Sequence, residues 1–552
     1  MQTNKNRFFS LARFAIFGIF LLGAPACDNV LDEEVISRIG NNYMNTPKGL
    51  EDAVNAAYSS MRLWYGTERG NNFTIFGTDT YTNGADGSWK FMNTYTTQFD
   101  TQNGHVREVW DGFYAGINNA NAIIERAPNV VGMSDPVKLQ RIAEAKFIRA
   151  HHYFILTQLF GGVDLRLTET LVPTKDVTRA TVAQQYEAII KDLTEAIPDL
   201  EAKAKSSQYG RATRPAAEHL LGKVYLTKAT SEAKAGNDYA NAIPLLQSVI
   251  NNYGLKLLPD FAAVHRQGNE INDEVIWSVQ YTRDPLTNGG GNNAHVFFLM
   301  EYDVLPGMQR DTENGRPFKR YRPTNYTLNV IFQDRVNDSR YKKSFKDTYY
   351  SNKPGKYNTS FDNSKPTVTF ALGDTAIFLP GYEMPVAQRA TKKYQVLVPS
   401  RYDERLFPAL TKHLDAGRVD RTQFEGGRDY IAFRLADTYL MLAEAQFMNN
   451  QVADAVSSIN MVRRRAAWPG KQAAMEITAA QLTMEFIMEE RERELIGEQM
   501  RWFDLKRWGV LVERVLAHNP QASAIQPHHV LRPIPQNQID RAATPFPQNP
   551  GY

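Results

Sequence analysis

Carboxylates and arginines alternate near the C-terminal end of the chain, in the stretch MEFIMEERERELIG at residues 484–497. Two carboxylates facing one sugar could cleave a glycosidic bond, with one as general acid and the other as nucleophile or base. The interleaved arginines would lower the pKa of these carboxylates and so remove the general acid. Glu489 and Arg493 also stand four residues apart, which favours an ion pair on one helix face. We therefore interpret the stretch as a salt-bridged helix, and the cluster Arg501/Asp504/Arg507 as its ion-pairing neighbour.

Metal and nucleophile motifs are weak or absent in the sequence. His151 and His152 are adjacent, so on a helix they point to different sides and make a poor ligand pair. The stretch DTYTNG at residues 79–84 hints at a calcium loop, but Lys90 stands where the bidentate glutamate should be. No GxSxG, HExxH or P-loop occurs. The sequence therefore predicts no metal, no cofactor and no catalytic residue.

Two irregular stretches carry residues suited to binding carbohydrate. Residues 64–103 lack helical periodicity and are dense in Gly, Asn, Thr and aromatics, and residues 282–425 contain many dispersed tyrosines. Sugars present C–H faces to aromatic rings and hydroxyls to short polar side chains. Core packing is the alternative for each aromatic. The predicted ligand-binding residues are Asp79, Asn83, Trp89 and Tyr95 in the first stretch, and Tyr302 and Tyr321 in the second.

Helix hairpins are expected to hold these stretches in place. Between residues 430 and 465, apolar residues recur at steps of three and four on both sides of a polar turn at 449–451. A second hairpin of similar pattern spans about residues 217–250, and segments 143–160 and 182–200 have the same character. The sequence predicts an all-α fold of tetratricopeptide-like helix-hairpin repeats with a large irregular insertion lobe. An ordinary helical bundle is the alternative.

Local signals predict several helix ends and one strand. Thr46 should cap a helix whose first residue is Pro47. Residues 106–127 should form a second helix, and a third should run from Ser134 to the glycines at 161–162. Alternation at residues 367–372 indicates a strand.

Composition is that of an ordinary globular protein, with 552 residues, 43% hydrophobic and 22% charged. The formal net charge is +3, and Lys5, Arg7 and Arg13 lie in the leader, so the remainder is neutral. Nothing in this balance predicts a nucleic-acid partner. Residues 310–346 carry ten Lys/Arg and four Asp/Glu, a local charge of +6. This suggests an acidic partner or a solvated, self-compensating surface.

The single cysteine, Cys27, follows a basic start, an apolar run at residues 14–22 and the small residues GAPA at 23–26. The run is too short to span a bilayer and predicts a secretory signal peptide. Small residues ending at a cysteine resemble the cleavage box of bacterial lipoproteins, which predicts lipidation of Cys27. An ordinary signal-peptidase site is the alternative. No other thiol remains for a disulfide, a nucleophile or a metal site.

Several segments, in order and spacing, carry a family resemblance. They are EDAVNAAYSSM, VWDGFYAGINNANAIIERA, AEAKFIRAHHYFILTQLFGGVDL, GRATRPAAEHLLGKVYL, FRLADTYLMLAEA, EERERELIGEQMRWFDLKRWG, LRPIP and the terminal QNPGY. With the cysteine box, the chain resembles, nearly end to end, the SusD/RagB-type nutrient-binding lipoproteins of the Bacteroidetes outer membrane.

The resemblance implies a lipid-anchored, non-enzymatic surface protein that captures oligosaccharide, or in some relatives peptide, for a partner SusC-like TonB-dependent transporter. It also implies that the loop after the first helix supplies acidic and aromatic contacts, and Asp79 and Trp89 occupy that loop. The expected division is a signal peptide (1–26), a lipidated tether (27–45), an N-terminal helical region (46–281), the insertion lobe (282–425) and a C-terminal helical region (426–552). A secreted glycoside hydrolase and a repeat scaffold that binds a peptide tail are the competing hypotheses.

Overall fold

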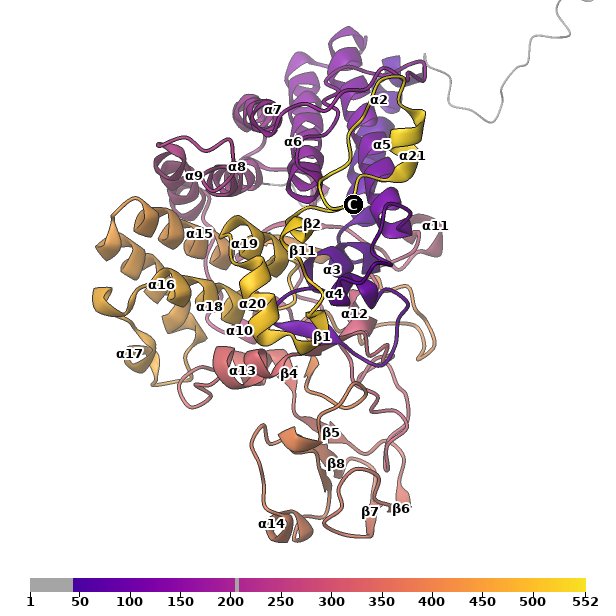
Figure 1. Cartoon of the computed structure of the whole chain (residues 1–552), viewed down its shortest axis with the longest axis vertical. Helices are drawn as coiled ribbons and strands as arrows, with labels where there is room; N and C mark the ends of the chain where they lie inside the picture. Colours follow the sequence, from indigo (N-terminus) through magenta and orange to yellow (C-terminus); the bar gives the residue numbers. More distant parts are fainter. Residues whose placement is uncertain (1–42, 204–207) are drawn as a thin grey trace, which may run out of the picture.

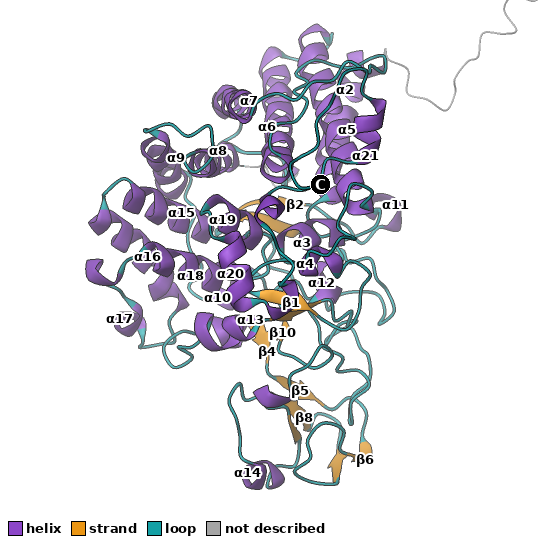
Figure 2. Cartoon of the chain, viewed as in Figure 1, coloured by secondary structure: helices purple, strands orange, loops and turns teal. Residues whose placement is uncertain are grey.

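The computed structural model describes residues 43–203 and 208–552, which form a helical body and a smaller strand-containing lobe (Figure 2). The predicted signal peptide, Cys27 and nearly all of the predicted tether lie outside the described residues. None of the described helices is long and apolar enough to cross a membrane. The boundaries expected between regions stay a prediction.

The N-terminal part of the body contains α2 (Pro47–Ser59), α5 (Gly104–Arg126), α6 (Asp135–Phe160) and α7 (Val182–Ala196), packed in sequence (Figure 1). The predicted cap is confirmed, because the Thr46 side chain accepts a hydrogen bond from the Gly49 amide at 3.1 Å. The predicted end of α6 is also confirmed. Gly161 follows the last turn with φ of +74°, a conformation in which glycine carries no Cβ penalty.

Two helix hairpins complete the body: α8 (Arg214–Lys228) packs on α9 (Asp238–Asn252), and α15 (Leu435–Met448) packs on α16 (Val452–Ala466). Helix α9 also packs on α15, which joins the hairpins side by side (Figure 1). The predicted all-α fold is confirmed, whereas the tetratricopeptide character of the repeats stays a prediction. One element was wrong: residues 430–434, expected to open a helix, form β11 (Tyr430–Arg434). This strand pairs with β2 (Val275–Val279), and all its residues are buried.

The remaining elements are short. The helices are α3 (Glu68–Thr74), α4 (Phe91–Thr94), α10 (Phe261–Val264), α11 (Pro285–Asn288), α12 (Ala294–Phe297), α13 (Arg340–Ser344), α14 (Val386–Ala390), α17 (Gln472–Met475), α18 (Met484–Leu495), α19 (Arg501–Arg507), α20 (Leu511–His518) and α21 (Gln536–Arg541). The strands are β1 (Tyr81–Asn83), β3 (Tyr321–Pro323), β4 (Phe345–Lys346), β5 (Thr348–Tyr350), β6 (Gly355–Asn358), β7 (Thr367–Phe370), β8 (Thr375–Phe378), β9 (Gln395–Val396) and β10 (Ala409–Leu410).

The lobe projects from the lower end of the body in Figure 1. It contains the three-stranded sheet β5-β8-β9 and the hairpin β6-β7, and β7 confirms the predicted strand. Its own apolar core includes Met300, Tyr302, Tyr349, Ile377 and Phe407. The lobe is therefore a packed unit built from the irregular insertion.

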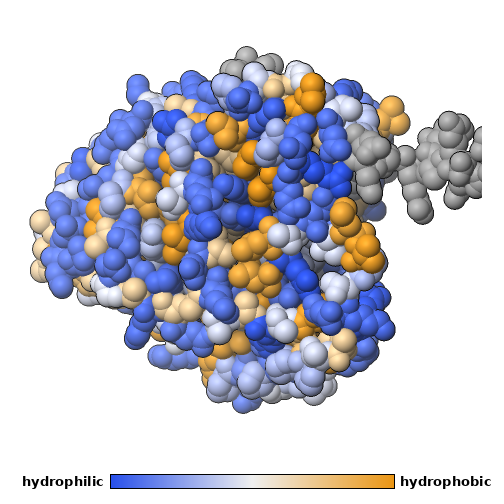
Figure 3. All heavy atoms as spheres, turned by 90° about the horizontal axis from the view of Figure 1, so that it is seen from above, coloured by the Kyte–Doolittle hydropathy of each residue, from blue (hydrophilic) through white to orange (hydrophobic). Residues whose placement is uncertain are grey.

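From the opposite, helical end, the surface is mostly hydrophilic, with hydrophobic residues in small separate groups (Figure 3).

A buried ionic network surrounds α18 and confirms the predicted salt-bridged helix. Glu489 and Arg493 lie 3.2 Å apart, and Arg491 reaches Asp504 of α19 at 3.0 Å. Arg434, at the end of β11, binds Glu494 at 2.6 Å and also Glu274 and Glu498. Burial alone would raise the pKa of Glu494, but Arg465, Arg434 and Arg340 lower it to about 2. These carboxylates are structural charges.

Glu492 differs from its neighbours on α18. Its side chain is buried, and this burial raises the pKa of its carboxyl to about 7, although Arg501 Nε lies 3.7 Å from one oxygen. Arginine proximity therefore does not keep every carboxylate of this stretch at low pKa, contrary to the sequence-based expectation. Glu492 is sealed inside the protein and lines none of the pockets described below.

A Glu492→Gln variant should become more stable than the wild type as pH rises. An unfolded glutamate ionises near pH 4.3, whereas folded Glu492 holds its proton to about pH 7, so the wild type loses stability between these values. Glutamine does not ionise. The difference in unfolding free energy, measured by urea denaturation, should shift in favour of the variant by up to about 3 kcal/mol between pH 5 and pH 8.

The exposed Glu513 of α20 supplies the matched control for this measurement. Glu513→Gln makes the same chemical change at an exposed position and should not reproduce the gain in stability expected of Glu492→Gln. A pH-independent difference for Glu492→Gln would contradict the assignment.

Candidate functional site

A pocket of about 740 Å³ lies where the helical body meets the lobe. Five segments far apart in the sequence form its walls. They are β1 through Thr82, β3 and the following turn through Arg322 to Val330, the lobe through Pro399, Tyr402 and Phe407, α18 through Glu485 and Glu489, and the end of α20 with the next turn through Ala517, His518, Pro520 and Gln521.

Pairing of β1 with β3 brings together the two irregular stretches predicted to bind ligand. Thr82 faces Arg322 and Asn83 faces Tyr321 in this antiparallel pair. Gln521 then fixes β1 from the C-terminal side, because its Oε1 accepts hydrogen bonds from Thr82 Oγ1 at 2.8 Å and from the Asn83 amide at 3.1 Å. The first stretch, the insertion and the C-terminal region thus form one rigid wall.

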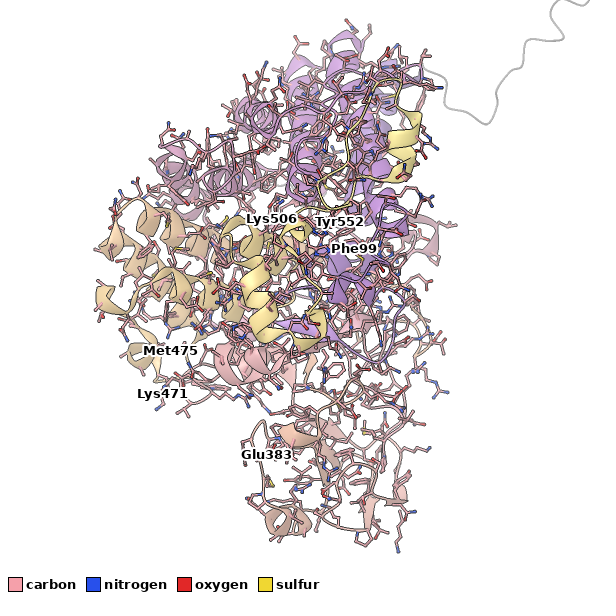
Figure 4. The ribbon with its side chains drawn as sticks, viewed as in Figure 1. Phe99, Glu383, Lys471, Met475, Lys506 and Tyr552 are labelled. Carbon is pink, nitrogen blue, oxygen red and sulfur yellow. The ribbon has the colours of Figure 1, made fainter. Side chains whose placement is uncertain are left out.

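The lobe wall is held by a separate set of hydrogen bonds. Glu383, labelled in Figure 4, accepts from the Ser400 amide at 2.6 Å and from its hydroxyl at 3.0 Å. Ser400 lies between the lining residues Pro399 and Tyr402. The half-buried Tyr402 packs against the cores of both body and lobe. Within the described chain its buried hydroxyl has no hydrogen-bond partner.

Two stacked rings line the opposite side. The imidazole of His518 lies on the ring of Tyr326 with centroids 3.9 Å apart and planes at 18°. Burial, followed by the charge of Arg514, lowers the pKa of His518, so the imidazole is neutral at pH 7. His518 is half-buried and Tyr326 is almost fully covered. The outer ring is therefore an uncharged flat surface, which suits stacking against the C–H face of a sugar.

Free amides and paired carboxylates supply the polar part of the lining. Asn325 and Asn329 are exposed, and neither side chain has a hydrogen-bond partner among the residues described. Glu485 accepts from Arg514 at 2.7 Å, and Glu489 lies 3.2 Å from Arg493. An amide donates and accepts at once, which matches a sugar hydroxyl.

Asp79, predicted to contact ligand, lies in the interior instead. Its two oxygens accept from Arg501 at 2.8 and 2.7 Å and from Arg514 at 2.8 Å. Burial opposes ionisation, but the two arginines lower the pKa of the carboxyl below its usual range. The predicted exposure of Asp79 is wrong, because the side chain is fully buried. It supports the pocket from behind, since Arg514 also donates to the Tyr326 hydroxyl.

Four other predicted site residues are also buried, contrary to the exposure expected of them. Tyr95 donates to the Gly77 carbonyl, Tyr302 to the Gly315 carbonyl and Tyr321 to Asn72 Oδ1, at 2.6 to 2.8 Å. The backbone of Asn83 lies in β1 and pairs with Tyr321 of β3. Each ring is covered because its hydroxyl has a hydrogen-bond partner inside the protein, which lets a tyrosine enter a core.

Trp89 is half-buried and lies outside the pocket. One face of its indole stacks on His105, with centroids 3.6 Å apart and planes at 23°. Its role in ligand binding stays a prediction. Trp110, Tyr153 and Trp502 are buried, whereas Trp508 is half-buried.

Two other cavities lie in the helical body. A pocket of about 570 Å³ lies beside Tyr95 and is lined by residues that include Phe99, His528 and Tyr552; Figure 4 shows Phe99 and Tyr552 close together. Another of about 570 Å³ lies between α2 and β2. No group of three or more His, Cys, Asp or Glu side chains in the described ranges could hold a metal ion.

Comparison with known proteins places the chain in a family. The family model described as "SusD family" matches residues 273–552, and the one described as "Starch-binding associating with outer membrane" matches residues 31–226. A SusD-like protein P25 of Formosa agariphila is 25% identical over 551 residues, covering 95% of each chain.

Solved structures show the same fold. A SusD homolog from Bacteroides thetaiotaomicron has a TM-score of 0.70 at 21% identity, covering 93% of this chain and 98% of the other. Surface glycan-binding protein A from Bacteroides thetaiotaomicron, in complex with laminarihexaose, has a TM-score of 0.68 at 20% identity, covering 91% and 99%. The matches span nearly the whole chain and its predicted motifs. This chain belongs to the SusD family.

Proposed function

We propose that this protein is a lipoprotein of the outer-membrane surface that binds glycan non-covalently in the pocket between body and lobe. It captures oligosaccharide or polysaccharide and passes it to a SusC-like TonB-dependent transporter. Lipidation of Cys27 would supply the anchor. Family membership, the family description that names starch binding and the outer membrane, and the similarity to a protein solved with laminarihexaose support the proposal.

The observation that carries the proposal is the composition of the pocket lining. A neutral stacked ring at His518 and free amides at Asn325 and Asn329 line one cavity of about 740 Å³. Flat apolar surface next to unpaired donors and acceptors is what a sugar ring requires. Pockets of this size hold a small ligand or a few residues of a chain.

The same lining supports a binding role over hydrolysis. Glu485 and Glu489 are the carboxylates that line the pocket, and each is paired with an arginine. Both carboxylates are held in ion pairs, whereas a glycosidase needs a pair of carboxyl groups free to act on one sugar as acid and as nucleophile or base. We therefore propose that the protein is not an enzyme.

An Asn325→Ala/His518→Ala double variant tests the site. Loss of one stacking surface and one amide should weaken glycan binding by about 2 kcal/mol, or more than tenfold. Binding of the full chain in detergent to an array of plant, algal and bacterial polysaccharides would identify the ligands, and calorimetry would measure the affinities. The melting temperature should change little, because both residues are at least partly exposed.

Gln247→Ala on the exposed face of α9 serves as the control and should bind as the wild type does. Unchanged glycan affinity in the double variant would remove the pocket from the binding site. Wild-type binding to a peptide library but to no glycan would favour the peptide-binding alternative.

A further inference from the structure

Arg322 is the one lining residue of the pocket whose charge has no ion pair within the described chain. No carboxylate oxygen of the described residues lies within 4 Å of its guanidinium, and its Nε is buried without a hydrogen-bond partner. Its neighbour two positions earlier, Arg320, is paired with Glu68. The cation at Arg322 is therefore available to a molecule in the pocket.

The other titratable residues that line the pocket are either paired with an arginine or neutral. Glu485 is paired with Arg514 at 2.7 Å, and Glu489 with Arg493 at 3.2 Å. His518 is neutral at pH 7, as described above. Arg322 therefore carries the one charge among the lining residues that has no ion-pairing partner within the described chain.

Two acidic residues near Arg322 do not neutralise it by contact. Asp403 accepts from the amides of Arg405 and Leu406 at 2.8 Å, and Glu404 accepts from Gln521 Nε2 at 3.0 Å. Both lie beyond ion-pair distance and only modestly favour the charged guanidinium. Burial has the larger effect and lowers the pKa of Arg322. The guanidinium is thus partly desolvated without a compensating anion.

A partly desolvated guanidinium gains most from an oxyanion that accepts two of its N–H groups at once. Carboxylates and sulfates both have this geometry. Strand β3 holds the backbone of Arg322 against Thr82, so the side chain projects from a rigid wall next to the amide of Asn325.

We propose that Arg322 binds an anionic substituent of the glycan, a uronate carboxylate or a sulfate ester, and makes this a site for acidic polysaccharide. This inference rests on the proposed function and adds the chemical class of the ligand. The pocket then recognises three features of one sugar: its flat face at His518, its hydroxyls at Asn325 and Asn329, and its acidic group at Arg322.

The test compares three full-length proteins on the same polysaccharide array: wild type, Arg322→Gln and Arg421→Gln. Arg421 is an exposed lobe residue outside the pocket lining, so its replacement removes the same charge at a matched control position. The array includes matched pairs that differ only in charge: polygalacturonate with its methyl ester, and dextran sulfate with dextran. The Asn325→Ala/His518→Ala variant identifies which ligands occupy the pocket.

The pocket ligands should be acidic, and Arg322→Gln should weaken their binding at least tenfold, whereas Arg421→Gln should stay within twofold. Uronates and sulfate esters are separate arms, so the class that loses affinity identifies the substituent. Raising NaCl from 0.05 to 0.5 M should weaken wild-type binding more than that of Arg322→Gln. Neutral pocket ligands, or acidic ligands bound equally well by Arg322→Gln, would overturn the inference and leave the proposed function intact. If the double variant loses no ligand, the proposed function and this inference both fail.

Discussion

Replacing Arg434 with methionine should lower the unfolding free energy by roughly 3–5 kcal/mol, the usual result of removing one partner of a buried ion pair. Arg434 is fully buried and binds Glu274, Glu494 and Glu498. Without it these carboxylates stay in the core with fewer cations, and their desolvation is no longer offset. Urea denaturation at pH 7, monitored by tryptophan fluorescence, measures the loss.

Arg464→Met is the matched control for this prediction. Arg464 pairs with Glu476 at 2.9 Å, but both side chains are more than 40% exposed. A solvent-exposed ion pair contributes about 0–1 kcal/mol, so this variant should unfold almost as the wild type does. If both variants lost the same unfolding free energy, burial of the ion pairs would not determine how much they contribute to stability.

Asp79→Asn should also destabilise the protein, by roughly 3 kcal/mol. Arg501 and Arg514 both depend on the Asp79 carboxylate, and an amide would leave two buried guanidinium groups facing a neutral side chain. The melting temperature, followed by circular dichroism, measures the effect. The loss should diminish at acidic pH, because the arginines hold the pKa of Asp79 below that of an unfolded aspartate and this stabilisation disappears as the carboxylate protonates.

Asp86→Asn provides the comparison within the same stretch. Asp86 is exposed, and its carboxylate accepts a hydrogen bond from the adjacent Gly87 amide. Its replacement should change stability by less than about 1 kcal/mol. If Asp79→Asn kept wild-type stability but lost glycan binding, Asp79 would return to the ligand site as the sequence first suggested.

The helices were predictable from sequence because their signals are local. Caps such as Thr46 and stops such as Gly161 act within a few residues, and apolar periodicity marks the buried face of α15 and α16. The exception is β11, an apolar run whose five residues are all buried. Periodicity does not separate such a strand from a buried helix, so its pairing with β2 had to come from the structure.

The two irregular stretches that meet at the candidate pocket are visible in the sequence, but most of its individual lining residues are not. Asp79 meets Arg501 and Arg514 across 422 and 435 positions of sequence. No local pattern reveals such partners, so the sequence predicts an exposed carboxylate at Asp79 where the structure has a buried one. Likewise, His518 and Tyr402 become neighbours of Arg322 only through tertiary packing. The cluster of Arg, Pro, Asn and Tyr at residues 322–329 was the one local signal that could have identified part of the pocket.

The span of the pocket has a consequence for biogenesis. Its walls run from Thr82 to Gln521, so a chain that stops anywhere before the last helices has no binding site. Pulse-labelled intermediates should therefore acquire affinity for sugar late, after most helices are formed. In the mature protein, a ligand bound in this pocket would bridge the early and late parts of the chain and would oppose their separation. Nutrient supply would then protect this receptor from proteolysis at the cell exterior.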